Sequence, residues 1–177
     1  MVYLISDILT KDECKYLTKQ FDIERTHNES VDYEYAGTNI SYGFEPSFLF
    51  NTYLDKLKLK VLKYNPNMYD LLNVNTYVRE YVNHSKLDKH IDRKEISVTM
   101  SICLESTINK DWPLFVEIDG NEYSYHTNVG DGIILFDADK NIHWRNDLIC
   151  NENERVLQFF LHWKPVDNTI KKTKSLI

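Results

Sequence analysis

The chain has 177 residues, of which 42% are apolar and 27% charged, and this is enough apolar material for the core of one globular domain. Five glycines and four prolines exclude a fibrous or disordered chain, because such chains are usually much richer in these residues. The net charge is −6, so the chain lacks the broad basic surface typical of nucleic-acid binding, and we expect no nucleic-acid partner.

A first helix is predicted close to the N-terminus. Thr10 and Glu13 have the spacing of a capping box, in which each side chain binds the other residue's backbone N–H, and apolar residues follow at helical intervals. This pattern predicts a helix over residues 10–21. The polar and aromatic stretch over residues 24–44 has no regular period, and we expect a loop there with a short strand near residues 33–35.

A second helix is predicted from Pro46, because proline suits the first turn of a helix. Asn65 and Pro66 end this helix, since proline cannot continue it. Between these limits an apolar stripe at helical spacing is formed by Phe50, Leu54, Leu57, Val61 and Tyr64.

Beyond Asn67 the apolar period changes from about 3.6 to 2, which is typical of strands. Asp119 and Gly120 separate two such segments and favour a two-residue hairpin turn. The strands are predicted at residues 72–81, 95–105, 114–118, 122–125, 132–136 and 155–163.

Two helices followed by many short strands predict an α+β, mainly β fold. The pattern suggests a β-sandwich or a jelly roll (double-stranded β-helix), with the N-terminal helices packed on one face. We expect one domain over residues 1–177, with helical support over about residues 1–70 and a strand core, the place for any functional site, over about residues 71–165.

Three side chains suited to a metal are candidates for one site. His90 and Asp92 lie two residues apart, so on an extended segment both point to the same side. The two residues lie between strand patterns, and His143 follows downstream as a third candidate. Two imidazoles and one carboxylate on one face of an iron ion leave the opposite positions open for substrate and oxygen. His27 and Glu29 have the same spacing but no strand frame, and we interpret them as surface residues.

Arg155, twelve residues beyond His143, opens an apolar strand pattern. A guanidinium suits a carboxylate because it donates two parallel hydrogen bonds. Taken alone, Arg155 is best interpreted as a structural ion pair with an acid such as Glu152 or Glu154. In combination with the candidate metal ligands, we favour a binding role for it.

The ordered set of motifs resembles the Fe(II)/2-oxoglutarate-dependent dioxygenases, in particular their prolyl-hydroxylase-like branch. The resemblance covers about residues 72–163, roughly half of the chain. It rests on a strand with Tyr77 and Tyr81, the His90-x-Asp92 pair, the strand over residues 95–105, the turn and strand over residues 130–136, His143 and Arg155.

The resemblance implies an enzyme, a hydroxylase that uses Fe(II) and O2 and converts its cosubstrate 2-oxoglutarate to succinate and CO2. The three candidate ligands would hold the iron, and no further catalytic side chain is implied. Arg155 would bind the distal carboxylate of 2-oxoglutarate. Tyr81, Tyr77 and Thr99 are further candidates for the cosubstrate pocket.

The substrate is expected to be a small molecule or a residue of a peptide or protein. Arg93 follows Asp92, and Arg145 lies two residues after His143. Both could present positive charge to the substrate, and each could equally form a surface ion pair. Trp112 and Trp144 are candidates for the pocket wall, although aromatic residues more often belong to the core. The nucleic-acid demethylase branch carries a second arginine six residues after the cosubstrate arginine, and here that position is Leu161.

Two other functions remain open. One is a cupin-like metal-binding enzyme that does not use 2-oxoglutarate, in which Arg155 would be dispensable for activity. The other is a non-catalytic jelly-roll binding protein, which the presence of all the candidate ligands disfavours. The sequence does not indicate an oligomeric state.

Cysteine usage and hydropathy indicate a cytoplasmic protein. Cys14, Cys103 and Cys150 match neither a zinc spacing nor a disulfide framework, which favours a reducing compartment. No apolar run reaches the roughly 18 residues of a membrane span, and the first residues do not form a signal peptide, so we expect no membrane partner.

Overall fold

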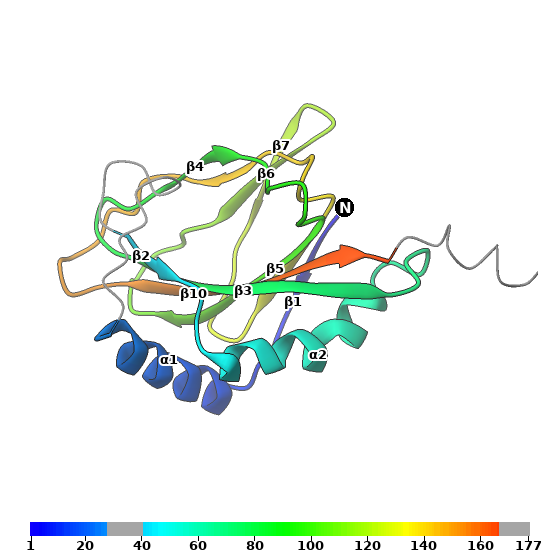
Figure 1. The fold of residues 1–177 in the computed structure, drawn as a ribbon. Helices are drawn as coiled ribbons and strands as arrows, with labels where there is room; N and C mark the ends of the chain where they lie inside the picture. The colour runs from blue at the N-terminus through cyan, green and yellow to red at the C-terminus, as the bar shows by residue number, and fades with distance from the viewer. Residues whose placement is uncertain (28–40, 167–177) are drawn as a thin grey trace, which may run out of the picture.

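The computed structural model describes residues 1–27 and 41–166, and in these ranges ten strands form two facing antiparallel sheets. The larger sheet has the order β1-β8-β5-β10-β3-β2, and the smaller sheet has the order β4-β9-β6-β7. Two helices cover the outer face of the larger sheet (Figure 1). This is the predicted mainly β jelly roll with helices on one face. The strands are β1 (Val2–Ile5), β2 (Ser41–Phe44), β3 (Leu71–Tyr81), β4 (Leu87–His90), β5 (Val98–Ser106), β6 (Leu114–Ile118), β7 (Asn121–Tyr125), β8 (Gly132–Phe136), β9 (His143–Arg145) and β10 (Val156–Pro165).

Helix α1 (Lys11–Arg25) begins at the predicted capping box and ends four residues later than predicted. The Thr10 hydroxyl accepts a hydrogen bond from the Glu13 backbone N–H, and the Glu13 carboxylate accepts one from the Thr10 N–H at 2.8 Å. The backbone N–H groups of Thr10 and Glu13 therefore both have acceptors at the N-terminal end of the helix, where N–H groups lack partners within the helix.

Helix α2 (Phe48–Leu62) begins two residues later than predicted, so Pro46 precedes the helix and does not occupy its first turn. Ser47 is the N-cap residue, and its backbone N–H donates to the Glu24 carboxylate at 2.8 Å. This contact with the end of α1 fixes how the chain enters the helix. No helix in the described part of the chain is long and apolar enough to cross a membrane.

The six predicted strands are all present, with ends that differ from the prediction by at most three residues. The turn between β6 and β7 is the predicted hairpin, with positive φ at both Asp119 (51°) and Gly120 (75°). Four further strands, β1, β2, β4 and β9, have three or four residues each and are too short to show a period of 2. Because β1 and β2 form the two edges of the larger sheet, residues 1–70 contribute strands as well as helical support. The strand predicted near residues 33–35 lies outside the described residues.

Strand β10 separates two parts of the core. Its residues Leu157, Phe159, Leu161 and Trp163 pack with the helices on the outer face of the larger sheet. Val156 and Phe160 pack on the opposite face, toward the smaller sheet. Successive side chains of a strand point to opposite faces, so this alternation decides which polar residues of β10 and its neighbour β3 face the space between the sheets.

Candidate metal centre and adjoining cavity

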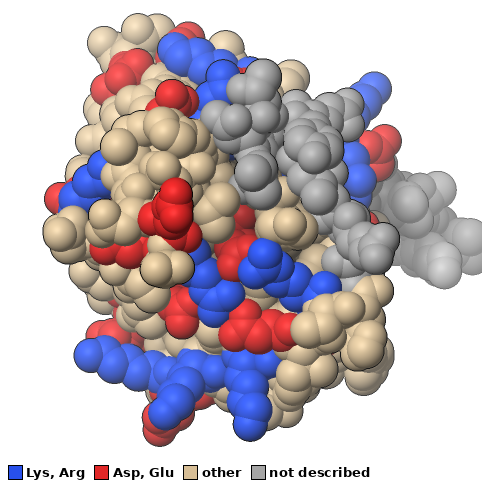
Figure 2. Space-filling view, turned by 90° about the vertical axis from the view of Figure 1, so that its left-hand side faces the viewer, with Lys and Arg blue, Asp and Glu red and all other residues tan. Residues whose placement is uncertain are grey.

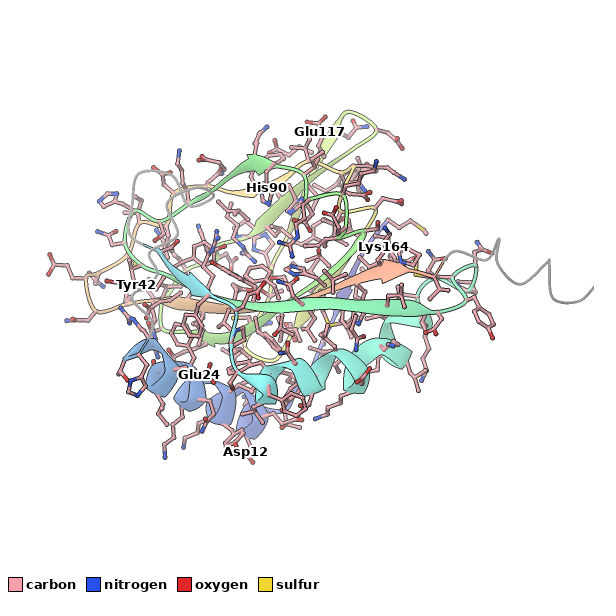
Figure 3. The ribbon with its side chains drawn as sticks, in the orientation of Figure 1. Asp12, Glu24, Tyr42, His90, Glu117 and Lys164 are labelled. Atoms are coloured by element: carbon pink, nitrogen blue, oxygen red, sulfur yellow. The ribbon has the colours of Figure 1, made fainter. Side chains whose placement is uncertain are left out.

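The structure brings the three predicted metal ligands together. His90 ends β4, Asp92 lies two residues further on, and His143 begins β9, directly opposite His90 in the pairing of the two strands. One ligand atom of each residue lies within 4.8 Å of the others. The Nε2 atoms of both histidines are 3.7 Å from Asp92 Oδ1. The His90 side chain lies on the side of β4 that faces the larger sheet (Figure 3).

Backbone carbonyls orient both imidazoles. The Nδ1 of His90 lies 2.8 Å from the Asp88 carbonyl oxygen, and the Nδ1 of His143 lies 3.0 Å from that of Asn141. A carbonyl only accepts hydrogen bonds, so each Nδ1 carries the proton and each Nε2 offers a lone pair toward Asp92. Burial and the neighbouring His143 imidazole lower the pKa of His90, which favours the neutral form that binds a metal.

The Asp92 carboxylate is held from the opposite sheet. Thr99 of β5 donates a 2.5 Å hydrogen bond to Asp92 Oδ2, and the Asp92 backbone N–H donates to the Ala138 carbonyl at 2.9 Å. The other carboxylate oxygen, Oδ1, faces the two imidazoles. Two imidazole nitrogens and one carboxylate oxygen on one side of a shared point are the donor set of a non-haem Fe(II) site, and the residues present fit such an ion.

A cavity of about 210 Å³ adjoins the three ligands between the sheets. Tyr77, Tyr81, Thr99 and Arg93, all predicted binding residues, line it. Its wall also contains Arg79 of β3, which the sequence analysis missed. Arg79 lies midway between Tyr77 and Tyr81, so the period of the strand could have identified it. The Arg79 guanidinium lies over both tyrosine rings, 5.4 and 5.7 Å from their centres.

The rim of the cavity carries a polar network centred on Asn75. The Asn75 side chain donates to Glu45 at 2.7 Å, accepts from Arg93 at 3.2 Å and lies 2.9 Å from His162 Nδ1. Burial, together with the charges of Arg93 and His143, lowers the pKa of His162 to about 4.

Arg155 lies elsewhere than predicted. It does not line the cavity; its guanidinium binds Asp22 at 2.7 Å, Glu80 at 2.9 Å and also Glu105. Partial burial opposes its charge, but the hydrogen bonds to these acids outweigh that effect and raise the pKa of Arg155. The reason is strand alternation: Arg155 precedes the inward-facing Val156, so it points to the helix side of the sheet.

The interpretation of Arg155 as a structural ion pair therefore fits the geometry, although its partners are not the sequence neighbours Glu152 and Glu154. Figure 2 shows the side of the molecule on which β10 begins. Basic and acidic side chains are mixed on this surface.

The two tryptophans and Arg145, all candidates for substrate binding, are not among the residues that line the cavity. Trp144 lies between two inward-facing residues of β9, so it points outward and stacks on Phe115 with ring centres 5.5 Å apart. Trp112 lies outside the cavity lining, and its indole N–H donates to the Asn146 carbonyl at 2.7 Å. Arg145 is 2% exposed and forms no surface ion pair; burial lowers its pKa.

Comparison with known proteins identifies the fold. No family model matches the chain, and no curated protein matches it in sequence. A prolyl-4-hydroxylase from Pseudomonas putida has the same fold, with a TM-score of 0.67 and 14% identity over 94% of this chain and 93% of that chain. An oxidoreductase of the 2OG-Fe(II) oxygenase family from Burkholderia pseudomallei gives a TM-score of 0.69 and 12% identity over 90% and 84%.

A third similar structure is HygX from Streptomyces hygroscopicus, solved with nickel and 2-oxoglutarate bound. It has a TM-score of 0.69 and 12% identity over 93% of this chain and 83% of that chain. The chain therefore has the fold of the 2OG-Fe(II) oxygenases and prolyl hydroxylases.

Proposed function

We propose that the protein is an Fe(II)- and 2-oxoglutarate-dependent oxygenase that hydroxylates its substrate and releases succinate and CO2. The observation that carries this proposal is the convergence of His90 Nε2, His143 Nε2 and one Asp92 oxygen beside a cavity between two jelly-roll sheets. The solved structures of the same fold support it, since one of them holds nickel and 2-oxoglutarate.

The bound metal would supply the chemistry of oxygen activation, for which the facial ligand set leaves positions open. The chain itself fixes the ligands and shapes the space beside them. The Asp88 and Asn141 carbonyls hold the imidazoles, and Thr99 holds the carboxylate. Apolar side chains of the cavity wall, among them Leu114 and Leu135, exclude water from the reacting groups.

The substrate we propose is a polar small molecule or a peptide or protein residue. Support comes from the rim, where Arg93 and Glu45 place opposite charges on either side of Asn75. The similar structures include one named as a prolyl-4-hydroxylase, and HygX, which was solved with the small molecule hygromycin B bound. We also propose a reducing, cytoplasmic location, supported by three cysteines that are all unpaired.

The test is to load the protein with Fe(II), add 2-oxoglutarate and O2, and measure succinate. We expect the wild type to bind the metal and release succinate slowly even without substrate. Asp92→Ala should abolish both metal binding and succinate release. Asp88→Ala is the matched control, because Asp88 lies on β4, four residues before Asp92, and its exposed carboxylate pairs with Lys86.

Each alternative function predicts a different result. A wild type that binds metal but shows no dependence on 2-oxoglutarate would support the cupin-like enzyme. A wild type that binds no metal would support the non-catalytic binding protein.

A further inference from the structure

Arg145 is a buried cation with unused hydrogen-bond donors. Its side chain is 2% exposed, and Nη1 donates to the Trp112 carbonyl at 2.7 Å. Among the described residues, Nε and Nη2 have no hydrogen-bond partner. A guanidinium enclosed in a protein without an acid is costly, because it loses its hydration and gains no compensating charge. An anionic ligand would supply the missing charge and accept hydrogen bonds from both nitrogens.

The position of Arg145 relates it to the metal ligands. It lies two residues after His143 on β9, so both side chains point to the same face, and their Cα atoms are roughly 7 Å apart along the strand. This spacing matches the length of a short dicarboxylic acid that chelates a metal at one end. Across the strand pair Arg145 lies opposite Leu87, which lines the cavity.

A second unused donor lies next to Arg145, which is not itself among the residues that line the cavity. The Tyr81 hydroxyl is buried and has no hydrogen-bond partner among the described residues, and the Tyr81 side chain lines the cavity. Tyr81 and Arg145 both pack on Trp112: the two aromatic ring centres are 4.8 Å apart, and the guanidinium lies 4.8 Å from the Trp112 ring. A carboxylate bound beside Tyr81 would accept hydrogen bonds from the tyrosine O–H and from the N–H groups of the two unpartnered guanidinium nitrogens, Nε and Nη2.

We infer that Arg145, together with Tyr81, binds the distal carboxylate of 2-oxoglutarate, and that Arg155 has a structural role. This inference rests on the proposed function. It assigns the carboxylate clamp to the strand that carries the distal histidine, whereas the sequence analysis assigned it to the start of β10. Arg79 is the competing candidate, because it lines the cavity directly and Arg145 does not.

The test compares two ligands that differ in the distal carboxylate alone. Calorimetry measures the binding of 2-oxoglutarate and of 2-oxovalerate, which has a methyl group in place of that carboxylate, to the Ni(II)-loaded protein. The wild type should prefer 2-oxoglutarate. Arg145→Met should weaken 2-oxoglutarate by about 100-fold and leave 2-oxovalerate unchanged, because two charge-assisted hydrogen bonds are lost. Arg155→Met is the matched control and should keep the wild-type preference.

A second variant guards against a folding defect. Arg145→Lys keeps the charge but loses the planar fork, and it should weaken 2-oxoglutarate by about 10-fold. Unchanged ligand preference in both Arg145 variants would overturn the inference and leave the proposed function intact. Loss of the preference in Arg79→Gln, with Arg145→Met unaffected, would also overturn it. A wild type that binds metal but no 2-oxoglutarate would overturn the proposed function and the inference together.

Discussion

The hydroxyl of Thr99 lies 2.5 Å from Asp92 Oδ2, and this hydrogen bond joins the two sheets at the metal site. Thr99 belongs to β5 of the larger sheet, while Asp92 follows β4 of the smaller sheet. The bond occupies one carboxylate oxygen and leaves the other to face the imidazoles. The orientation of a metal ligand therefore depends on a residue that does not bind the metal itself.

Thr99→Val removes the hydroxyl without changing the size of the side chain, and it should weaken Fe(II) binding by about 10-fold or more. The reason is that Asp92 loses the contact that orients it. Competition with a chelator of known affinity measures the effect. Thr99→Ser keeps the hydroxyl and should bind as the wild type does; equal affinity in Thr99→Val would show that the hydrogen bond does not orient the ligand.

Arg155→Met should lower the free energy of unfolding by about 1–3 kcal/mol, because it removes a partner from Glu80, which is 2% exposed. Arg25 still pairs with Glu80 at 2.8 Å, so the loss should remain below that of a fully isolated charge. Urea unfolding of the metal-free protein measures the change. Glu152→Ala, at an exposed position of the same loop, serves as the control and should have no effect. Unchanged stability in Arg155→Met would refute a structural role for this arginine.

Local patterns were sufficient to predict much of the fold and to single out the three candidate metal ligands that the structure brings together. The capping box of Thr10 and Glu13 and the Asp119-Gly120 turn each depend on residues close in sequence, and both are present. His90 and Asp92 were recognisable because their spacing places two ligands on one side of an extended chain. His143 was predicted as the third ligand from its place in the order of motifs. In the structure, the pairing of β4 with β9 brings it close to His90 and Asp92.

The direction of Arg155 was not predicted, because β10 is buried on both faces. An alternating strand shows its inner face by its apolar residues, but here Val156, Leu157 and Phe159 are all buried and no alternation is visible. The direction of Arg145 can be deduced from the sequence, because it lies two residues after His143 and their side chains point to the same face of a strand. Its burial depends on Trp112, which is distant in sequence.

The stability of the metal-free protein should fall as the pH decreases from about 6.5 to about 4. His162 has a pKa of about 4 in the fold against 6.5 ordinarily, since burial disfavours its charged form. Between these values the unfolded chain binds a proton that the folded chain does not, so the free energy of unfolding rises with pH. The contribution of His162 should be about 1–3 kcal/mol.

Urea unfolding at pH 4.5 and 7.5, with a chelator present, measures this dependence. His162→Gln keeps a polar side chain that does not titrate, and it should reduce the difference between the two pH values. The prediction fails if the variant and the wild type lose the same stability on acidification.

Thr10→Ala should destabilise the protein by about 1 kcal/mol, because the backbone N–H of Glu13 loses its acceptor at the start of α1. Thermal unfolding followed by circular dichroism measures the change. Lys11→Ala, at the exposed neighbouring position, should leave the stability nearly unchanged. An equal effect of both substitutions would argue against the capping contribution.

The most direct measurement is an anaerobic titration of the metal-free protein with Fe(II) and then 2-oxoglutarate, followed by visible absorption. If His90, Asp92 and His143 hold iron beside a cosubstrate pocket, a weak charge-transfer band should appear after both additions and be absent in Asp92→Ala. Tight binding of iron without any band on addition of 2-oxoglutarate would contradict the proposed activity.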